Sequence, residues 1–238
     1  IDRLAVTLPG HAEPIIRPFI YDIAAGSKVA VVGNNGAGKT TLLQTLAGAW
    51  SPGEGSVSLG ARDLHRWASE DRGQYVGYVP QAVELMPATV AENIARLTPD
   101  AVEAVITAAR QAGAHEMILG LPNGYDTPIG NGGARLSAGQ TQLIGLARAM
   151  FGQPVLLLVD EPTANLDAES AARTIDAFDM LARQGTIIIA ATHDPRLIRA
   201  FDTVLVIRRG TVQAIAASDY AVGGDRRLSL IPAAGDAA

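Results

Sequence analysis

The sequence predicts an α/β fold, with a mostly parallel sheet under helices on both faces, an antiparallel β-subdomain and an inserted helical subdomain. Three observations support this prediction. Short apolar runs of strand length alternate with helical patterns along the chain. A glycine-rich turn joins one of these runs to a helix. A block of helical patterns from about Glu84 to Gln153 interrupts the alternation and marks the inserted subdomain.

Strands are predicted where apolar runs are bounded by glycine, proline or polar turn residues. The run from Val155 to Val159 contains no polar residue, which is typical of a parallel strand buried on both faces. The strand-like stretches are Ile1 to Leu8, Ile15 to Ile23, Val29 to Val32, Ser56 to Leu59, Tyr75 to Val79, Val155 to Val159, Thr186 to Ala191 and Val204 to Ile207.

Helices are predicted where apolar residues recur at helical spacing. Leu42, Leu43 and Leu46 lie on one side of the first helix, and Gly48 is its stop signal. Asp100 is expected to cap the third predicted helix. The predicted helices are Thr41 to Ala47, Val90 to Leu97, Ala101 to Ala112, His115 to Leu121, Ser137 to Met150 and Ala168 to Ala182.

Length and composition restrict the possible functions. The 238 residues suit a domain with a subdomain, which we assign to residues 1–222, followed at 223–238 by a tail expected to be disordered. The net charge of −5 argues against non-specific binding of nucleic acid, and the lack of cysteine excludes disulfides and thiol catalysis. The apolar runs are too short to cross a bilayer. Because the chain begins with Ile1 rather than methionine, we expect a piece of a longer protein.

The glycine-rich turn has the composition of a phosphate-binding loop. Its glycines allow backbone angles that let successive N–H groups converge on an anion, and the following helix start adds partial positive charge. Lys39 can reach the β- and γ-phosphates, and the Thr40 hydroxyl can bind Mg²⁺. In an ordinary structural turn, a lysine at the start of the helix would oppose the helix dipole without reason. The turn comprises Gly33, Asn34, Asn35, Gly36, Ala37, Gly38, Lys39 and Thr40.

Two further stretches could complete an anion site. The apolar strand before Asp160 and Glu161 ends in two carboxylates, where α/β sheets bind their ligands. A Mg²⁺ ion near Asp160 would offset the cost of burial and leave Glu161 to hold an attacking water. Ser137 and Gly139 begin the strongest predicted helix and offer a second anion-binding helix start. A solvated turn before Pro162 and a routine serine cap are the structural alternatives.

Together these residues resemble the nucleotide-binding domain of the ABC (ATP-binding cassette) ATPases, which has a P-loop NTPase core. The resemblance runs from about Ile1 to Ala214 and keeps the motif order of the family. The glycine-rich turn resembles Walker A, and Leu136 to Gln140 resembles the signature motif. Asp160 and Glu161 resemble Walker B and the catalytic base.

Three more segments resemble motifs of this family. Gln81 resembles the Q-loop glutamine, Ala164 to Asp167 the D-loop, and His193 the switch histidine. The resemblance implies ATP and Mg²⁺ as cofactors. It assigns catalysis to Lys39, Glu161 and His193. It assigns Mg²⁺ binding to Thr40, Gln81 and Asp160. It assigns contacts with ATP to the glycine-rich turn and to Thr41, Gln81, Ser137, Gly139 and Asp167.

The chain departs from the family pattern at a few positions. Ala138 replaces the first signature glycine, which is acceptable where φ is negative. Thr141 and Leu143 stand where basic residues are usual. Leu8 or His11 falls near the position of the aromatic residue that stacks on adenine. Weaker base stacking, and hence looser discrimination among nucleotides, is the resulting hypothesis.

The resemblance implies that two such domains dock head-to-tail and clamp ATP between the Walker loop of one and the signature of the other. Thr127 to Gly133 resembles the loop by which exporters contact their membrane helices, and Tyr78 to Gln81 and Thr89 to Ile94 are also exporter-like. With Leu119 to Thr127, the pattern is most similar to the type I protein- or peptide-secretion ATPases.

That class implies the partners and the location. We expect an N-terminally fused membrane domain, a periplasmic adaptor, an outer-membrane channel and a position on the cytoplasmic face of the inner membrane. Val83, Leu85 and Met86 are candidates for contact with a coupling helix or, alternatively, for subdomain core. A soluble ABC ATPase acting in translation or nucleic-acid maintenance, a catalytically silent binding module and an importer ATPase are the alternatives.

Overall fold

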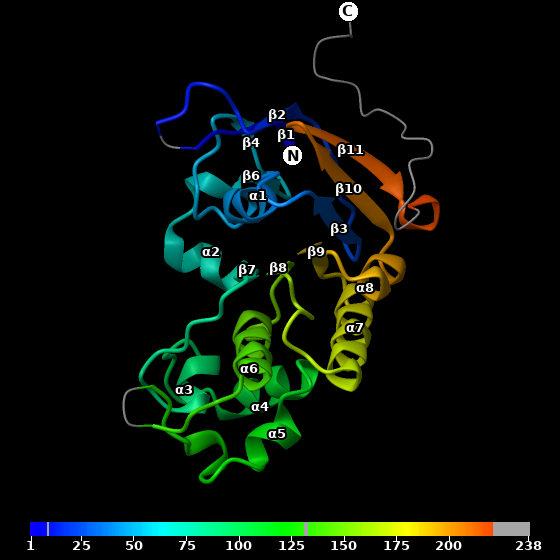
Figure 1. Cartoon of the computed structure of the whole chain (residues 1–238). Helices are drawn as coiled ribbons and strands as arrows, with labels where there is room; N and C mark the ends of the chain where they lie inside the picture. Colours follow the sequence, from blue (N-terminus) through cyan, green and yellow to red (C-terminus); the bar gives the residue numbers. More distant parts are fainter. Residues whose placement is uncertain (9, 131–132, 221–238) are drawn as a thin grey trace, which may run out of the picture.

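The computed structural model describes residues 1–8, 10–130 and 133–220 (Figure 1). The tail predicted at 223–238 lies outside the described residues, as do Asn131 and Gly132 of the exporter-like loop. Within the described part, the chain folds into a central sheet, two small antiparallel sheets and helices that pack around them.

The central sheet has six strands within the described residues, in the order β11-β10-β3-β9-β8-β7. Five run parallel, and β11 joins the edge antiparallel to β10. This arrangement brings the carboxyl ends of β3, β7, β8 and β9 to one edge, where α/β sheets bind ligands. The strands are β3 (Lys28–Gly33), β7 (Val76–Val79), β8 (Leu156–Asp160), β9 (Ile187–Ala191), β10 (Thr203–Arg208) and β11 (Thr211–Ala216).

Antiparallel strands form the two smaller sheets, in the orders β2-β1-β4 and β5-β6. The backbone N–H of Arg17 donates to the carbonyl of Gly210 over 2.7 Å and so joins β2 to the turn between β10 and β11. The strands are β1 (Asp2–Val6), β2 (Ile16–Phe19), β4 (Glu54–Ser56), β5 (Ser58–Leu59) and β6 (Arg62–Asp63).

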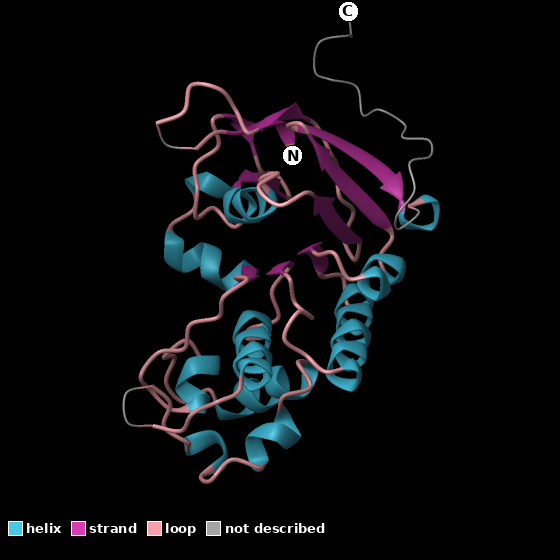
Figure 2. Ribbon diagram, in the orientation of Figure 1, coloured by secondary structure: helices cyan, strands magenta, loops and turns pink. Residues whose placement is uncertain are grey.

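Helices cover both faces of the central sheet, and those between β7 and β8 gather in a separate block at the bottom of Figure 2. Side chains of Thr89, Ser137, Asp167 and Asp194 cap the helices that follow them. The helices are α1 (Lys39–Leu46), α2 (Ser69–Tyr75), α3 (Val90–Ile94), α4 (Val102–Gln111), α5 (His115–Leu119), α6 (Ala138–Met150), α7 (Ala168–Arg183) and α8 (Pro195–Ala200).

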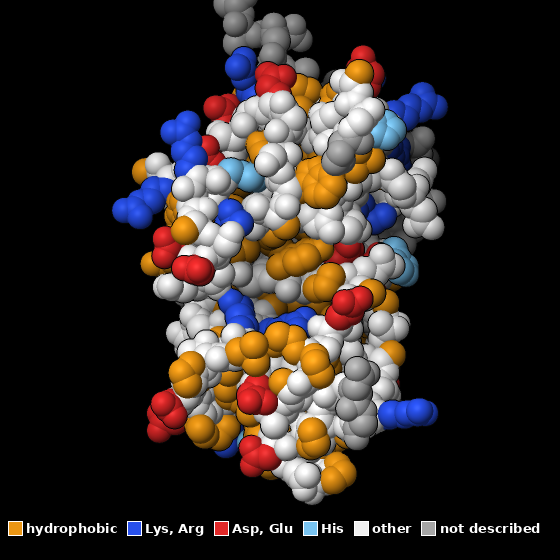
Figure 3. Space-filling model, turned by 90° about the vertical axis from the view of Figure 1, so that its left-hand side faces the viewer, with side chains coloured by type: hydrophobic (Ala, Val, Ile, Leu, Met, Phe, Trp, Pro, Cys, Tyr) orange, Lys and Arg blue, Asp and Glu red, His pale blue; other side chains and the backbone are white. Residues whose placement is uncertain are grey.

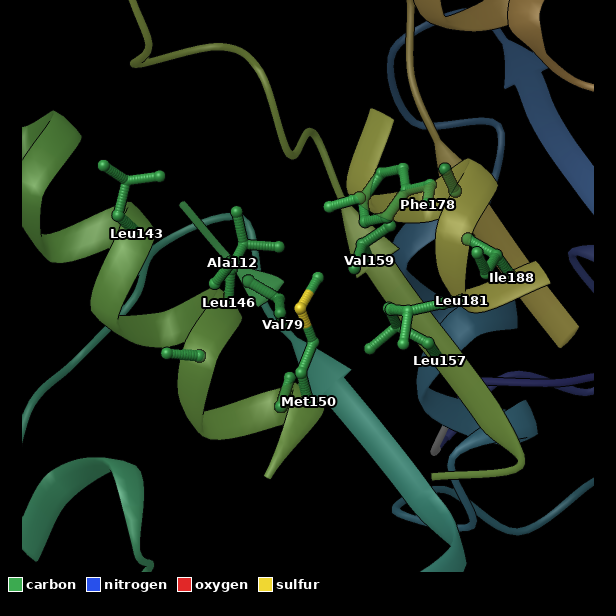
Figure 4. Packing of buried hydrophobic residues seen from close by; sticks show 14 of the residues in the cluster. Val79, Ala112, Leu143, Leu146, Met150, Leu157, Val159, Phe178, Leu181 and Ile188 are labelled. Carbon is green, nitrogen blue, oxygen red and sulfur yellow. The ribbon is translucent and has the colours of Figure 1, made fainter. Parts of the chain in front are cut away.

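The core has two parts, because alternate residues of each central strand point to opposite faces. On one face, Leu157 and Val159 of β8 pack with Met150 of α6 and Phe178 of α7 (Figure 4). On the other face, neighbouring residues of the same strands pack against α1, β1 and β2. Burial on both faces explains why the central strands are continuous apolar runs.

The predicted α/β fold with a mostly parallel sheet and separate antiparallel strands is confirmed, but several local predictions are wrong. Ala101, not Asp100, is the N-cap of α4, and Asp100 has a φ of +54°. The single strand expected at Ser56 to Leu59 is two strands in different sheets, because the chain turns Val57 into the core between them. Helices α2 and α8 and strand β11 were not predicted.

Candidate functional site

The glycine-rich turn lies between β3 and α1, and its backbone conformation and packing favour glycine at Gly33 and Gly38. Gly38 caps α1 with a φ of +98°, which disfavours any residue with a side chain. A Cβ placed on Gly33 would lie 2.9 Å from the backbone oxygen of Ile207 on β10. A side chain at either position would strain the turn or displace its neighbours, so this backbone path to the start of α1 depends on both glycines.

Lys39 lies along this turn. Its Nζ donates to the backbone oxygen of Gly33 over 2.9 Å and to that of Asn34 over 3.3 Å. These carbonyls offset the unfavourable position of a cation in the first turn of a helix. The ammonium group is thus held beside the loop that we expect to bind phosphate.

The side chains of Thr40 and Asp160 are in direct contact, with Thr40 Oγ1 donating to Asp160 Oδ2 over 2.6 Å. Asp160 is 1% exposed, and burial raises the pKa of its carboxyl; the hydrogen bond from Thr40 and the charge of Lys39 oppose this rise. The hydroxyl oxygen of Thr40 and the carboxylate oxygens of Asp160 are hard ligands of the kind that Mg²⁺ prefers. Mg²⁺ sites often use one or two such protein ligands, and phosphate oxygens complete the coordination. Both residues therefore suit the predicted metal role.

Glu161 and His193 form a second pair at the same edge. Nδ1 of His193 lies 2.8 Å from Oε1 of Glu161. Glu161 has a φ of +50°, and its backbone N–H donates to the carbonyl of Ala191 at the end of β9 over 2.8 Å. Its side chain is only 12% exposed, whereas that of His193 is 83% exposed. A carboxylate at the surface of the core thus faces an accessible imidazole.

The sheet register explains why residues distant in sequence meet here. Asp160 on β8 pairs with Ala191 on β9, which in turn pairs with Val31 on β3. The loops after these three strands therefore emerge side by side. Val79 on β7 pairs with Val159, so the exposed Gln81 follows at the same edge.

Ser137, Gly139 and Asp167 lie in a different place, around the start of α6 and the segment before α7. Ser137 caps α6 in a capping box with Gln140, and Asp167 caps α7. The backbone N–H of Ser170 donates to Asp167 Oδ1 over 2.7 Å, and this hydrogen bond lowers the pKa of Asp167. A Cβ on Gly139 would lie 2.9 Å from the backbone oxygen of Asn165, so the two segments touch.

A cavity of about 520 Å³ opens where these two segments meet. Its lining includes Ser137, Gly139, Gln140, Asn165, Asp167 and Arg173. Ala138, the departure from the expected glycine, is the first residue of α6 and has ordinary helical backbone. The signature-like stretch therefore keeps its helix start despite the substitution.

The other positions that differ from the family pattern are described by their burial. Leu143 is buried in the core, which explains an apolar residue there, and Thr141 is half-buried. Leu8 is half-buried and His11 is exposed. Trp50 donates its indole N–H to the backbone oxygen of Thr7, next to Leu8.

Comparison with known proteins gives a consistent result. The family model described as ABC transporter matches residues 16–164. The chain is 39% identical over 224 residues to the type I secretion system ATP-binding protein PrsD of Rhizobium meliloti, which covers 94% of this chain and 38% of that protein. It is 39% identical over 199 residues to the ATP-dependent lipid A-core flippase of Chromohalobacter salexigens, covering 83% of this chain and 34% of that protein.

A solved structure is also similar. A bacterial Atm1-family ABC exporter with ATP bound matches with a TM-score of 0.82 and 30% identity, over 92% of this chain and 38% of that one. The chain thus spans well under half the length of each of these relatives. No helix in the described part of the chain has the length and apolar character needed to span a bilayer.

Proposed function

This chain belongs to the ABC transporter family, and on that premise we propose that it is the ATP-hydrolysing domain of an exporter in a type I secretion system for protein or peptide. One observation carries the proposal. Lys39, Thr40, Asp160, Glu161 and His193 lie at one edge of the sheet, where Thr40 contacts Asp160 and Glu161 contacts His193. The similarity to a type I secretion ATP-binding protein supports the choice of exporter class.

The residues at this edge have distinct roles in the proposed reaction. Backbone N–H groups of the turn and the ammonium of Lys39 bind the β- and γ-phosphates. Glu161 holds the attacking water and accepts its proton. His193 contacts Glu161 through Nδ1, so its Nε2 is directed elsewhere. As an imidazolium, the ring donates to the Glu161 carboxylate through Nδ1 and to the γ-phosphate through Nε2.

Mg²⁺ belongs to the same proposal. Thr40 and Asp160 would hold the ion, with Gln81 reaching it from the loop after β7. When bound, Mg²⁺ supplies positive charge that offsets the phosphate oxygens. The buried carboxylate of Asp160 is the feature that most favours a cation here, since burial disfavours its charge.

The proposed active unit is a head-to-tail homodimer. Ser137 and Gly139 start a helix that is apart from the phosphate loop of their own subunit, and an exposed helix start is a ready anion site. We assign them, with Asp167, to the ATP held by the neighbouring subunit. A C2 arrangement would satisfy both sites at once.

The partners follow from the exporter class. We propose an N-terminally fused membrane domain, a position on the cytoplasmic side of the inner membrane, and a periplasmic adaptor and outer-membrane channel. The face shown in Figure 3 has hydrophobic and basic side chains along the waist between the sheets and the helical block, where a membrane partner could dock. Val83 and Leu85 pack against the core, which favours a structural role for these two residues.

The domain division is proposed on the same basis. Residues 1–222 form the ABC ATPase domain, and the block from about 84 to 153, which holds α3 to α6, is its helical subdomain. The acidic balance of the chain leaves nucleic acid outside the set of proposed partners.

Phosphate release by the purified chain with Mg²⁺ and ATP tests the proposed function. We expect turnover by the parent and its loss in Lys39→Ala, with Lys28→Ala as a lysine control outside the loop. Turnover unaffected by Lys39→Ala would contradict the assignment of the site. The exporter class is tested by reading the coding sequence upstream of Ile1, where about six apolar spans of roughly 20 residues are expected.

A further inference from the structure

One hydrogen bond joins the two loops that carry the hydrolytic pair. Oγ1 of Thr163 donates to Oδ2 of Asp194 over 3.0 Å. Thr163 follows Glu161 by two positions, and Asp194 directly follows His193. Thr163 is 6% exposed and the Asp194 side chain is 13% exposed, so the bond is largely sheltered from water. In such surroundings a hydrogen bond is stronger than at an open surface.

Asp194 is itself fixed from several directions. Its Oδ1 accepts from the backbone N–H of Arg196 over 2.9 Å and from Nε over 3.1 Å, and Oδ2 accepts from Nη2 over 2.9 Å. Its backbone N–H donates to Thr192 Oγ1 over 3.0 Å. Burial alone would raise the pKa of Asp194, but the bonds from Arg196 and Thr163 outweigh it and lower the pKa. Asp194 is therefore an ionised acceptor whose two carboxylate oxygens are both hydrogen-bonded, and it holds Thr163 through one of them.

Neither member of the hydrolytic pair is held in place by packing alone. The His193 side chain is 83% exposed. Glu161 adopts a φ of +50°, a strained conformation for a residue with a side chain, which persists only where its surroundings enforce it. The bond from Glu161 N–H to Ala191 restrains one side of the loop, and the bond from Thr163 to Asp194 restrains the other.

We propose that Thr163 and Asp194 are positioning residues that hold the loops of Glu161 and His193 at the separation required for hydrolysis. The inference rests on the proposed ATPase function. Neither residue touches the reacting atoms in this account. Their contribution is to keep the 2.8 Å contact between Glu161 and His193, since a shift of about 1 Å in such a pair can cost on the order of a hundredfold in rate.

The test uses Thr163→Val in the full chain, because valine keeps the branched shape and removes only the hydroxyl. Thr163→Ser restores a hydroxyl. The matched control is Thr186→Val, since Thr186 is 7% exposed and donates a single bond, over 3.0 Å, to Pro154 at the opposite end of the sheet. Both valine variants thus lose one hydrogen bond donated by a buried threonine hydroxyl. Only Thr163 lies beside the proposed site.

We expect Thr163→Val to lower kcat for ATP about tenfold or more with KM changed less than about threefold. Thr163→Ser should regain most of the rate, and Thr186→Val should stay within about twofold of the parent. Equal kcat values for the two valine variants would overturn the proposal. A rise in KM with kcat unchanged would also overturn it, because binding and not positioning would then have been lost.

A second measurement does not depend on hydrolysis. The imidazole ¹⁵N signals of His193, assigned with a His193→Gln variant, report its contact with Glu161. We expect them to move in Thr163→Val and to stay in place in Thr186→Val; unchanged signals in both variants would overturn the positioning role. A parent chain that does not hydrolyse ATP would contradict the proposed function, while the ¹⁵N signals would still decide this inference.

Discussion

Nδ1 of His193 lies 2.8 Å from Oε1 of Glu161, so the proposed base and the proposed switch histidine form one hydrogen-bonded unit. Glu161→Gln removes the basic group but keeps the shape of the side chain. We expect ATP hydrolysis to fall about 100-fold or more, as for loss of a general base. ATP binding should persist, and the variant should dimerise with ATP, which light scattering after size exclusion would detect.

Glu169→Gln is the matched control, because its side chain is 79% exposed on α7 and pairs only weakly with Arg173. Its hydrolysis rate should remain near that of the parent. Near-normal hydrolysis by Glu161→Gln would refute the assignment of the base.

Asp160 provides a test of electrostatics in the chain without nucleotide. Burial raises its pKa above the ordinary value of 3.8. Below that value the carboxyl is protonated in both the folded and unfolded states. Between that value and the raised pKa of the folded state, the unfolded state ionises first, so the folded state is progressively destabilised as the pH rises. Asp160→Asn should therefore unfold at a higher urea concentration than the parent at pH 8, with the difference closing below about pH 4.

The exposed Asp176 on α7 offers the matched control for this measurement. Asp176→Asn should follow the parent at both pH values. A parent more stable than Asp160→Asn at pH 8 would contradict the expected sign.

Gly139 tests the proposed dimer. An alanine Cβ there would lie 2.9 Å from the backbone oxygen of Asn165, so one of the two segments must move. In the Glu161→Gln background, Gly139→Ala should weaken ATP-dependent dimerisation about tenfold, a loss of about 1.4 kcal/mol in binding free energy. Ala138→Gly is the neighbouring control and should dimerise as its background does. Equal dimerisation of both variants would speak against a role for Gly139 at the interface.

Leu8 tests the hypothesis of loose base recognition. If no aromatic ring stacks on adenine, kcat/KM for ATP and GTP should agree within a few-fold in the parent chain. Leu8→Tyr should tighten ATP binding about tenfold, since stacking of a base on an aromatic side chain contributes roughly 1–3 kcal/mol. His11→Tyr, at an exposed position, is the comparison. Strong preference of the parent for ATP would sink this hypothesis.

Arg96 tests how the segment after α3 is held to the end of α6 and to α2. Its guanidinium donates to the backbone oxygens of Gly73, Arg148, Ala149 and Phe151. Three of these lie at the end of α6, where carbonyls lack partners within the helix. Arg96→Met should lower the free energy of unfolding by about 2 kcal/mol in urea titrations, since it leaves sheltered carbonyls unpaired.

Arg66→Met removes the same charge from a side chain that is 86% exposed, and we expect it to change stability by less than about 0.5 kcal/mol. A similar effect of both substitutions would show that the contacts of Arg96 contribute little.

Much of the sheet could be predicted because its chemistry is local. Leu157 and Val159 face one core and their neighbours face the other, so burial on both sides leaves a continuous apolar run in the sequence. Strand β11 was not predicted, although Gly210 just before it is a turn signal in the sequence. Arg209 and Gly210 form a two-residue turn with φ of +49° and +77°, which is typical of a tight hairpin.

The candidate site also has parts that the sequence predicts and parts that it does not. The glycine-rich turn and the acids after β8 carry short-range patterns that predict their position at the ends of strands. The bond from Thr163 to Asp194 and the contacts of Arg96 with α6 join segments far apart in sequence, with no periodicity to mark them. Such contacts depend on how whole elements pack, and therefore only the folded chain shows them.

Ser137 caps α6 with a lone pair and not with its proton. Its Oγ accepts the backbone N–H of Gln140 over 3.2 Å, and Oε1 of Gln140 accepts the serine's own N–H over 2.8 Å. The Ser137 hydroxyl is thus oriented by the bond that its oxygen accepts, and its hydrogen can donate to a phosphate oxygen of the ATP held by the neighbouring subunit. Formation of the proposed dimer would therefore leave the first turn of α6 intact. The helix cap uses the oxygen of the Ser137 hydroxyl as acceptor, and the contact with phosphate would use its hydrogen as donor.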